Sequence, residues 1–332
     1  MRSPVLSLSE TTVLPAPVWT AEAARHQRRI AQRTDPIIAL HHAGTRHPVY
    51  DFLFTYYSHS PAALQRWHPG PGVVLAAHPD DAPAIHPDDA PAAGSAPAAD
   101  RSTWRHYRWV APGEHPDAPH GGWTVDLAAF LAERGDGVAF IRDLVARTAA
   151  RQPRLGCFGL HEWAMAYRSE LHGVRHSSVP LRLGAAGTNA VVEAATIQCT
   201  HVDAFRFFAP EARELNTEQP TRAGMRSQEQ PGCLHATMDL YKWCVKLLPA
   251  VTSSLTADCF ELAWQVREMD MKASPYDLAD WGFEPIRIET PAGRAEYVRA
   301  QSEFARRGQA LRARLLAEID GWLTSRPARM DP

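Results

Sequence analysis

Lysine is scarce in this chain, which has three lysines and 32 arginines among its 332 residues. Positive and negative side chains still almost balance, because 35 Lys and Arg stand against 37 Asp and Glu, and the formal net charge is -2. The chain therefore lacks the basic excess that is typical of proteins binding nucleic acid or anionic membranes over a broad surface. This balance favours a small-molecule substrate and is compatible with a local basic patch.

Long hydrophobic runs and paired cysteines are also lacking. No stretch of about 18 apolar residues occurs, so we expect no membrane-spanning helix. The first 19 residues contain one Arg and no sustained apolar segment, which is unlike a secretory signal peptide. The five cysteines have spacings that match no disulfide framework. We therefore expect a cytoplasmic protein with reduced thiols.

The composition is that of a globular protein, with 45% hydrophobic and 22% charged residues. We expect a single globular domain over residues 1–332, which begins with an extended arm over 1–19. Residues 71–100 are rich in Ala, Pro and Asp and contain the repeat HPDDAPA at 78–84 and 86–92. That composition predicts a low-complexity loop or insert.

Apolar residues recur at helical spacing through much of the remaining chain. The clearest helix spans 233–248, where an apolar stripe begins at Leu234 and Pro249 ends the helix. Further helices are predicted in the segments 20–33, 124–150, 257–271 and 294–323, with 124–150 split into two near Gly135.

A small β element accompanies these helices. We expect a strand within 101–112 and a β-hairpin over 180–193, which turns at Gly187-Thr188-Asn189. Thr200 and Asp203 have the spacing of a capping box that opens a short helix. The predicted fold is therefore mainly α, with a small β element and a helical core around residues 157–284.

Three segments combine a cysteine with a closely following histidine and acidic residue. They are GCFGLHEWAMAYR, CTHVDAFRFF and GCLHATMDLYKW, and the three combinations fall within residues 157–239. Tyrosine and tryptophan are interspersed among them. Proton-transfer groups, metal-ligand types and stacking surfaces are thus concentrated in one part of the chain, which indicates an enzyme site.

The third segment has a defined geometry on the predicted 233–248 helix. His235, Asp239 and Lys242 fall on one face of that helix. A histidine and a carboxylate one turn apart can share a metal ion, or the carboxylate can orient the histidine for proton transfer. A solvated face with an Asp–Lys pair explains the same spacing, and the sequence does not decide between these interpretations.

Several long strings resemble a family of bacterial proteins labelled 3-methyladenine DNA glycosylase. These strings are HPVYDFLFTYY, RWHPG, GCFGLHEWAMAYR, CTHVDAFRFF, PGCLHATMDLYKW and DCFELAWQVREMDMKASPYDL. The resemblance covers most of the chain except residues 71–122. It implies hydrolysis of the N-glycosidic bond of a modified or alkylated nucleobase, as in DNA repair, on a nucleobase, nucleoside or damaged DNA, with no cofactor expected. The helix-hairpin-helix motif of the well-understood alkyladenine glycosylases does not occur, so no catalytic Asp is carried over from it.

Such a reaction requires a carboxylate that stabilises the sugar cation and activates water, and aromatic side chains that stack on the extruded base. On chemical grounds we expect Asp239 to be the carboxylate, with Asp203 and Glu162 as alternatives. His235 or His161 would be its acid–base partner. The expected substrate contacts are Trp163, Tyr167, Tyr241, Trp243, Lys242 and Asp277.

Two other classes of protein stay open. A metal-dependent hydrolase or oxygenase would bind a divalent Fe, Zn or Mn ion through His201, His235 and Asp239, with His161 nearby. A non-catalytic protein that binds a small ligand is the other class.

Glu268 and Asp270 precede a polar turn over 274–277, and turn formation explains these acidic residues better than substrate contact does. The sequence does not indicate an oligomeric state.

Overall fold

The computed structural model describes residues 11–78, 101–176 and 178–324. It is mainly α-helical with one small four-stranded sheet, as predicted. The long helices are α1 (Ala16–His42), α4 (Leu127–Ala149), α11 (Leu234–Leu247), α12 (Ser253–Lys272) and α13 (Pro291–Thr324). Among the described residues, no helix combines the length and the apolarity needed to cross a membrane.

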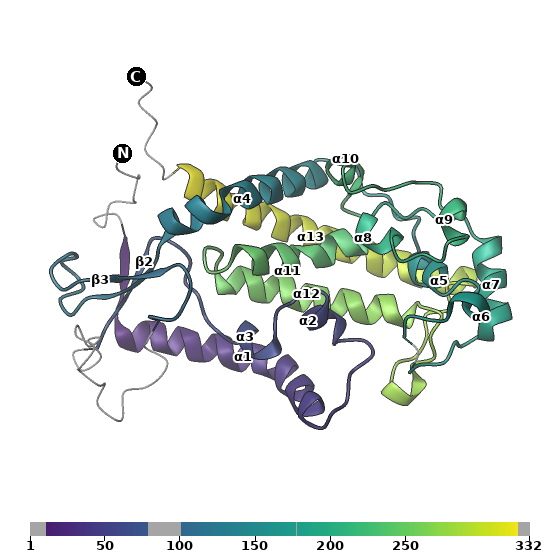
Figure 1. Cartoon of the computed structure of the whole chain (residues 1–332), viewed down its shortest axis with the longest axis horizontal. Coiled ribbons are helices and arrows are strands. Elements are labelled where there is room, and N and C mark those ends of the chain that lie inside the picture. The colour runs from purple at the N-terminus through teal and green to yellow at the C-terminus, as the bar shows by residue number, and fades with distance from the viewer. Residues whose placement is uncertain (1–10, 79–100, 177, 325–332) are drawn as a thin grey trace, which may run out of the picture.

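Helix α11 lies at the centre of the bundle, where it packs against both α12 and α13 (Figure 1). All but three of its residues are buried, which agrees with the apolar stripe that predicts this helix. Helix α4 runs along α13, and α1 contacts α12 from another side. One hydrophobic core joins these five helices and excludes water from the centre of the bundle.

The small sheet lies at one end of the bundle, on the left in Figure 1. Its strands are β1 (Thr12–Leu14), β2 (Val73–Ala76), β3 (Tyr107–Val110) and β4 (Gly122–Val125), in the spatial order β1-β2-β4-β3. Only the β1–β2 pair is parallel, with Val13 opposite Val74, and the other pairs are antiparallel. The β-branched residues of these strands suit a pleated, half-buried surface.

Short helices gather around the bundle and at its opposite end (Figure 1). Two of them lie between α1 and β2 in the chain: α2 (Phe52–Thr55) and α3 (Pro61–Leu64). The others are α5 (Leu160–Met165), α6 (Ser169–His172), α7 (Gly184–Ala194), α8 (Val202–Phe205), α9 (Ala212–Leu215) and α10 (Met225–Gln228). The region from α5 to α10 contains two of the three Cys–His–acid segments, and it covers one end of α11 and α12.

The β-hairpin predicted over 180–193 is wrong, because this segment forms helix α7. Gly187 and Asn189 are typical of a turn, but the Thr188 hydroxyl donates to the Gly184 carbonyl oxygen at 2.7 Å within the helix. Burial of Val192 adds packing that local turn chemistry does not anticipate.

The predicted break near Gly135 is also wrong, since α4 continues through it. A helical glycine costs about 1 kcal/mol relative to alanine, and burial of Phe130, Val138 and Ile141 on one face of α4 offsets that cost.

Two predicted irregular segments are shorter than expected. Of the extended arm over 1–19, residues 12–14 form β1 and α1 begins at Ala16, while residues 1–10 lie outside the described part of the chain. Of the low-complexity segment over 71–100, residues 73–76 form β2, and residues 79–100 lie outside the described ranges. The capping box is wrong too, because His201 is the N-cap of α8 and no side chain caps it.

Removal of the Phe260 ring tests the packing between α11 and α12. Phe260 is fully buried, and its ring centroid lies 5.3 Å from that of Tyr241 and 5.7 Å from that of Trp264. We expect Phe260→Ala to lower the free energy of unfolding by about 3–5 kcal/mol, because the variant leaves a cavity. Urea denaturation measures this change. Leu171→Ala is the control, since Leu171 is 67% exposed and its loss should cost at most about 0.5 kcal/mol. A similar effect of both substitutions would contradict the packing.

Candidate functional site

The histidines of the three Cys–His–acid segments meet in the structure. His161 lies in α5, His201 immediately precedes α8, and His235 lies in the first turn of α11. The ring centroid of His235 lies 4.5 Å from that of His161 and 5.2 Å from that of His201. Three segments that are separate in the sequence therefore converge around His235.

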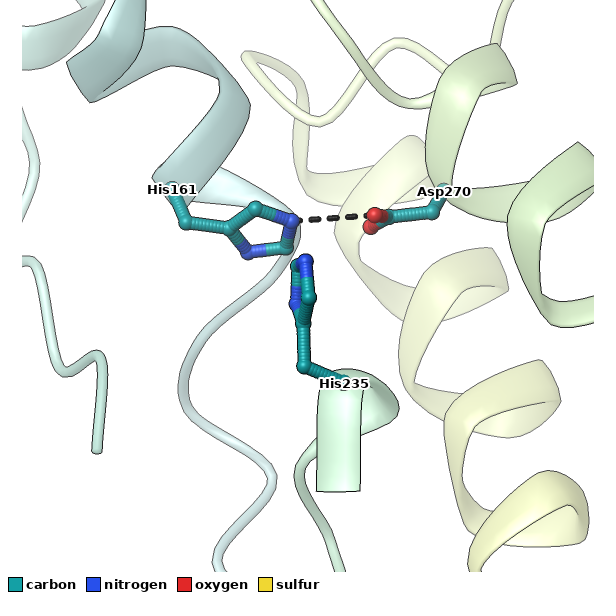
Figure 2. A group of neighbouring side chains, drawn as sticks. All are labelled: His161, His235 and Asp270. Atoms are coloured by element: carbon teal, nitrogen blue, oxygen red, sulfur yellow. Dashed lines mark hydrogen bonds and ion pairs between the residues drawn. The ribbon is translucent and has the colours of Figure 1, made fainter. Parts of the chain in front are cut away.

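A carboxylate from α12 completes the first of two clusters. Figure 2 shows Asp270 and His235 beside His161, whose Nε2 donates a hydrogen bond to Asp270 Oδ2 at 2.9 Å. One ligand atom from each of the three side chains lies within 4.8 Å of the others. All three residues are buried. This set of two imidazoles and one carboxylate is a common ligand set for divalent transition metals.

Neighbouring side chains hold His161 and Asp270 in orientation. His161 Nδ1 lies 3.3 Å from Cys157 Sγ, and the Tyr297 hydroxyl donates to Asp270 Oδ1 at 3.3 Å. Contacts of this kind hold ligands in orientation around a metal. The ring of His235 makes no hydrogen bond to any described residue, so both of its nitrogens are available to a ligand.

The electrostatics of the two histidines differ. Burial opposes a charge on His161, but the adjacent Asp270 carboxylate and the Cys157 sulfur raise the pKa of His161 well above its ordinary value. Burial lowers the pKa of His235 well below its ordinary value, and the neighbouring His161 and His201 lower it further. His235 is therefore neutral, which is the form that binds metals, whereas His161 holds a proton that a metal ion would displace.

The second cluster consists of His201, Glu229 and Asp239, whose ligand atoms also lie within 4.8 Å of one another. Here a cation is already present, because Lys242 Nζ lies 2.8 Å from Asp239 Oδ2. His201 Nε2 approaches the same oxygen at 3.3 Å, and the Tyr57 hydroxyl donates to Oδ1 at 3.2 Å. Burial opposes the charge on Asp239, but Lys242 and His201 hold the pKa of this carboxyl below its usual range. Both carboxylate oxygens of Asp239 are thus occupied.

Two pockets adjoin the clusters, and His235 lines both. We name the first, a small cavity of about 10 Å³, the thiol pocket. Its lining includes Cys157, Cys199, Cys233, His161, Thr200 and Gln301. We name the second, a small cavity of about 20 Å³, the charged pocket. Its lining includes Glu162, Arg175, Asp203, Phe207 and Arg267.

Two of the three predicted catalytic carboxylates line the charged pocket, and the third lines neither pocket. Asp239 lines neither pocket, because Lys242 and Tyr57 enclose it. Glu162 lines the charged pocket and forms a buried ion pair with Arg267 at 2.9 Å. Asp203 lines the same pocket and lies 3.1 Å from Lys242 Nζ.

The predicted substrate contacts lie mainly in the hydrophobic core. The four aromatic side chains are buried and line neither pocket: Trp163, Tyr167, Tyr241 and Trp243. Asp277 is exposed and accepts a hydrogen bond from the Ala279 N–H in a turn, also away from both pockets. The predicted metal set of His201, His235 and Asp239 is divided between the two clusters.

Asp270 is the main site residue that sequence reasoning assigned wrongly, because turn formation was favoured for it and the structure places it beside His161 and His235. Asp270 follows Ala263 by seven residues and Val266 by four, so it falls on the apolar face of α12. A carboxylate within an apolar stripe requires a buried partner, and this spacing is the signal that could have identified it. Glu229 carried no comparable signal, because it lies in an irregular segment after α10.

Comparison with known proteins adds no family assignment, since no protein family, curated protein or solved structure matches this chain. The geometry of the two clusters and the two pockets therefore carries the functional argument.

The role of Lys242 as the cation of the second cluster is testable. Lys242→Met should lower the free energy of unfolding by about 3–5 kcal/mol, because it leaves the buried Asp239 carboxylate without its main counter-charge. Lys246→Met on the same helix is the matched control, since Lys246 is exposed. Urea denaturation at neutral pH compares the two variants. The double variant Lys242→Met/Asp239→Asn should recover part of the loss, and equal stability of both lysine variants would contradict this role.

Proposed function

We propose that the protein is a metal-dependent hydrolase in which His161, His235 and Asp270 bind a divalent metal ion. The observation that carries this proposal is the convergence of two imidazoles and one carboxylate within 4.8 Å. His235 has no other hydrogen-bond partner among the described residues, which fits a ligand role better than a structural one. A set of three protein ligands leaves coordination positions open for water and substrate.

The residues around the cluster support this assignment. Cys157 and Tyr297 hold His161 and Asp270 in orientation, so little conformational freedom is lost when a metal binds. A divalent ion there would polarise a substrate carbonyl and lower the pKa of water. The donor set suits zinc, iron or manganese. Hydrolysis is favoured over oxygenation because the Cys157 sulfur touches a ligand and would be exposed to oxidising species.

Hydrolysis of an N-glycosidic bond stays a prediction from the sequence, as do a nucleobase, nucleoside or damaged DNA as substrate and a role in DNA repair. The burial of the four predicted stacking residues and the enclosure of Asp239 give this reading less support than the metal cluster gives to a metallohydrolase. A cytoplasmic location and the alternative of a non-catalytic ligand-binding protein also stay predictions.

Metal analysis tests the proposed function. Protein purified without chelator, or loaded with Zn²⁺ and desalted, should retain about one equivalent of metal per chain. Elemental mass spectrometry measures this amount. His235→Gln should lower retention at least tenfold and keep the melting temperature, because His235 makes no hydrogen bond within the described chain. Glu268→Gln is the control on α12, since Glu268 bonds only Tyr50 among the described residues.

The second cluster provides the contrasting result. Lys242 already compensates its charge, so His201→Gln in folded protein should leave metal retention unchanged. Loss of metal in the His201 variant but not in the His235 variant would place the ion in the second cluster and contradict its binding by His161, His235 and Asp270. The absence of metal retention in the wild-type protein would contradict the proposed function altogether.

A further inference from the structure

Arginine side chains gather on the surface beside the charged pocket. Arg175 and Phe207 belong to the lining of that pocket, and Arg206 directly precedes Phe207 in the chain. The guanidinium carbon of Arg175 lies 3.7 Å from the centroid of the Phe207 ring, and that of Arg206 lies 4.6 Å from the same centroid. Two cationic groups thus contact one aromatic ring, which is itself 36% exposed.

A third arginine joins this group through Asp203. Arg206 Nε lies 3.6 Å from Asp203 Oδ1, and Arg222 Nη1 lies 3.4 Å from the same oxygen. Lys242 Nζ lies 3.1 Å from the other carboxylate oxygen of Asp203. We name Arg175, Arg206 and Arg222 the arginine cluster, and all three side chains are exposed.

The arginine cluster has more positive than negative charge. Among the described residues, Asp203 is the one carboxylate that pairs with a member of the cluster, and it also pairs with Lys242. Arg175 makes no ion pair with a described residue. Glu162, the other acid of the charged pocket, is already paired with Arg267. Three guanidinium groups therefore face a single carboxylate, and an anion with two negative charges would balance them.

The chemistry of guanidinium groups favours a phosphate group as this anion. Arginine donates pairs of parallel N–H bonds to phosphate oxygens, and a phosphate monoester carries a charge of about −1.5 to −2 at neutral pH. A carboxylate carries a single charge. The charged pocket, of about 20 Å³, has room for water only, so the phosphate lies outside it, on the exposed side of the arginine cluster.

We propose that the arginine cluster binds the phosphate group of a small molecule. Arg175 and Arg206, which share the Phe207 ring, donate to its oxygens, and Arg222 supplies the third cation. The formal net charge of -2 favours a small phosphate over nucleic acid, which requires a broad basic surface. None of the three arginines belongs to the metal cluster, so this inference goes beyond the proposed function and does not depend on it.

Isothermal titration calorimetry of the full chain with inorganic phosphate tests this site. Bound metal is first removed with a chelator, so that contact of phosphate with a metal ion does not contribute. Low ionic strength is used, because salt screens exposed charges. At neutral pH we expect phosphate to bind at least about tenfold more tightly than acetate, which carries one charge. Phenyl phosphate is the third probe: tighter binding than inorganic phosphate would identify a phosphate monoester as the ligand, and weaker binding the free ion.

Arg175→Gln removes one guanidinium group of the arginine cluster. We expect this variant to weaken phosphate binding about tenfold, the effect of one hydrogen bond to a charged group. Its melting temperature should change little, because Arg175 is exposed and has no ion pair among the described residues. Arg25→Gln is the matched control, since it changes the net charge equally at a 69% exposed side chain of α1, away from the charged pocket. Phosphate binding should not change in this control.

The outcomes separate this inference from the proposed function. Unchanged phosphate binding in Arg175→Gln, an equal loss in Arg25→Gln, or equal affinity for phosphate and acetate would overturn the inference. Binding of duplex DNA that depends on Arg175, without binding of either phosphate probe, would assign the arginine cluster to nucleic acid and overturn it as well. Phosphate binding that depends on Arg175 in a protein that retains no metal would support the inference and overturn only the hydrolase.

Discussion

Two parallel charged contacts between α5 and α12 hold the site together. His161 contacts Asp270, and the next residue, Glu162, contacts Arg267 one turn earlier on α12, both at 2.9 Å and both buried. Buried ion pairs contribute little net stability, because desolvation of the charges offsets their attraction. They are specific in geometry, however, so a shift of α5 by one residue would separate both pairs. The register that they impose is what brings His161 beside His235.

His235 also lies between two pockets that differ in the charge of their linings. On one side the charged pocket contains paired carboxylates and guanidinium groups, and on the other the thiol pocket contains thiols, amides and a hydroxyl. Gln301 Oε1 and the Thr200 hydroxyl have no hydrogen-bond partner among the described residues, and buried atoms of this kind are unfavourable for folding unless water or a ligand bonds them. Burial of Cys199 and Cys233 raises the pKa of both thiols, which disfavours the thiolate form that a nucleophile requires.

Local sequence pattern predicts the long helices well and the site only in part. The stripe on α11 correctly gave the buried face of that helix, and the spacing of His235 and Asp239 drew attention to the right helix. The pattern allowed a pair of Asp239 with Lys242, which is three residues away. It could not show that His235 points to α5 and α12 or that Asp239 contacts Tyr57, because these contacts join segments far apart in the chain. The hairpin over 180–193 was wrong for the same reason, since tertiary packing overrode the local preference of its glycines.

The contrast between the two clusters shows why donor type alone does not define a metal site. Both clusters contain histidine and carboxylate within the same distance, but in one of them the ammonium of Lys242 already bridges Asp239 and Asp203. A compact ammonium with three donors can serve two carboxylates at once, which the planar fork of arginine does less well. This geometry gives a physical reason for a lysine at this position in a chain that has three lysines and 32 arginines. The cluster of His161, His235 and Asp270 contains no lysine or arginine, and the charge of Asp270 is balanced by the proton of His161, which a metal ion would displace.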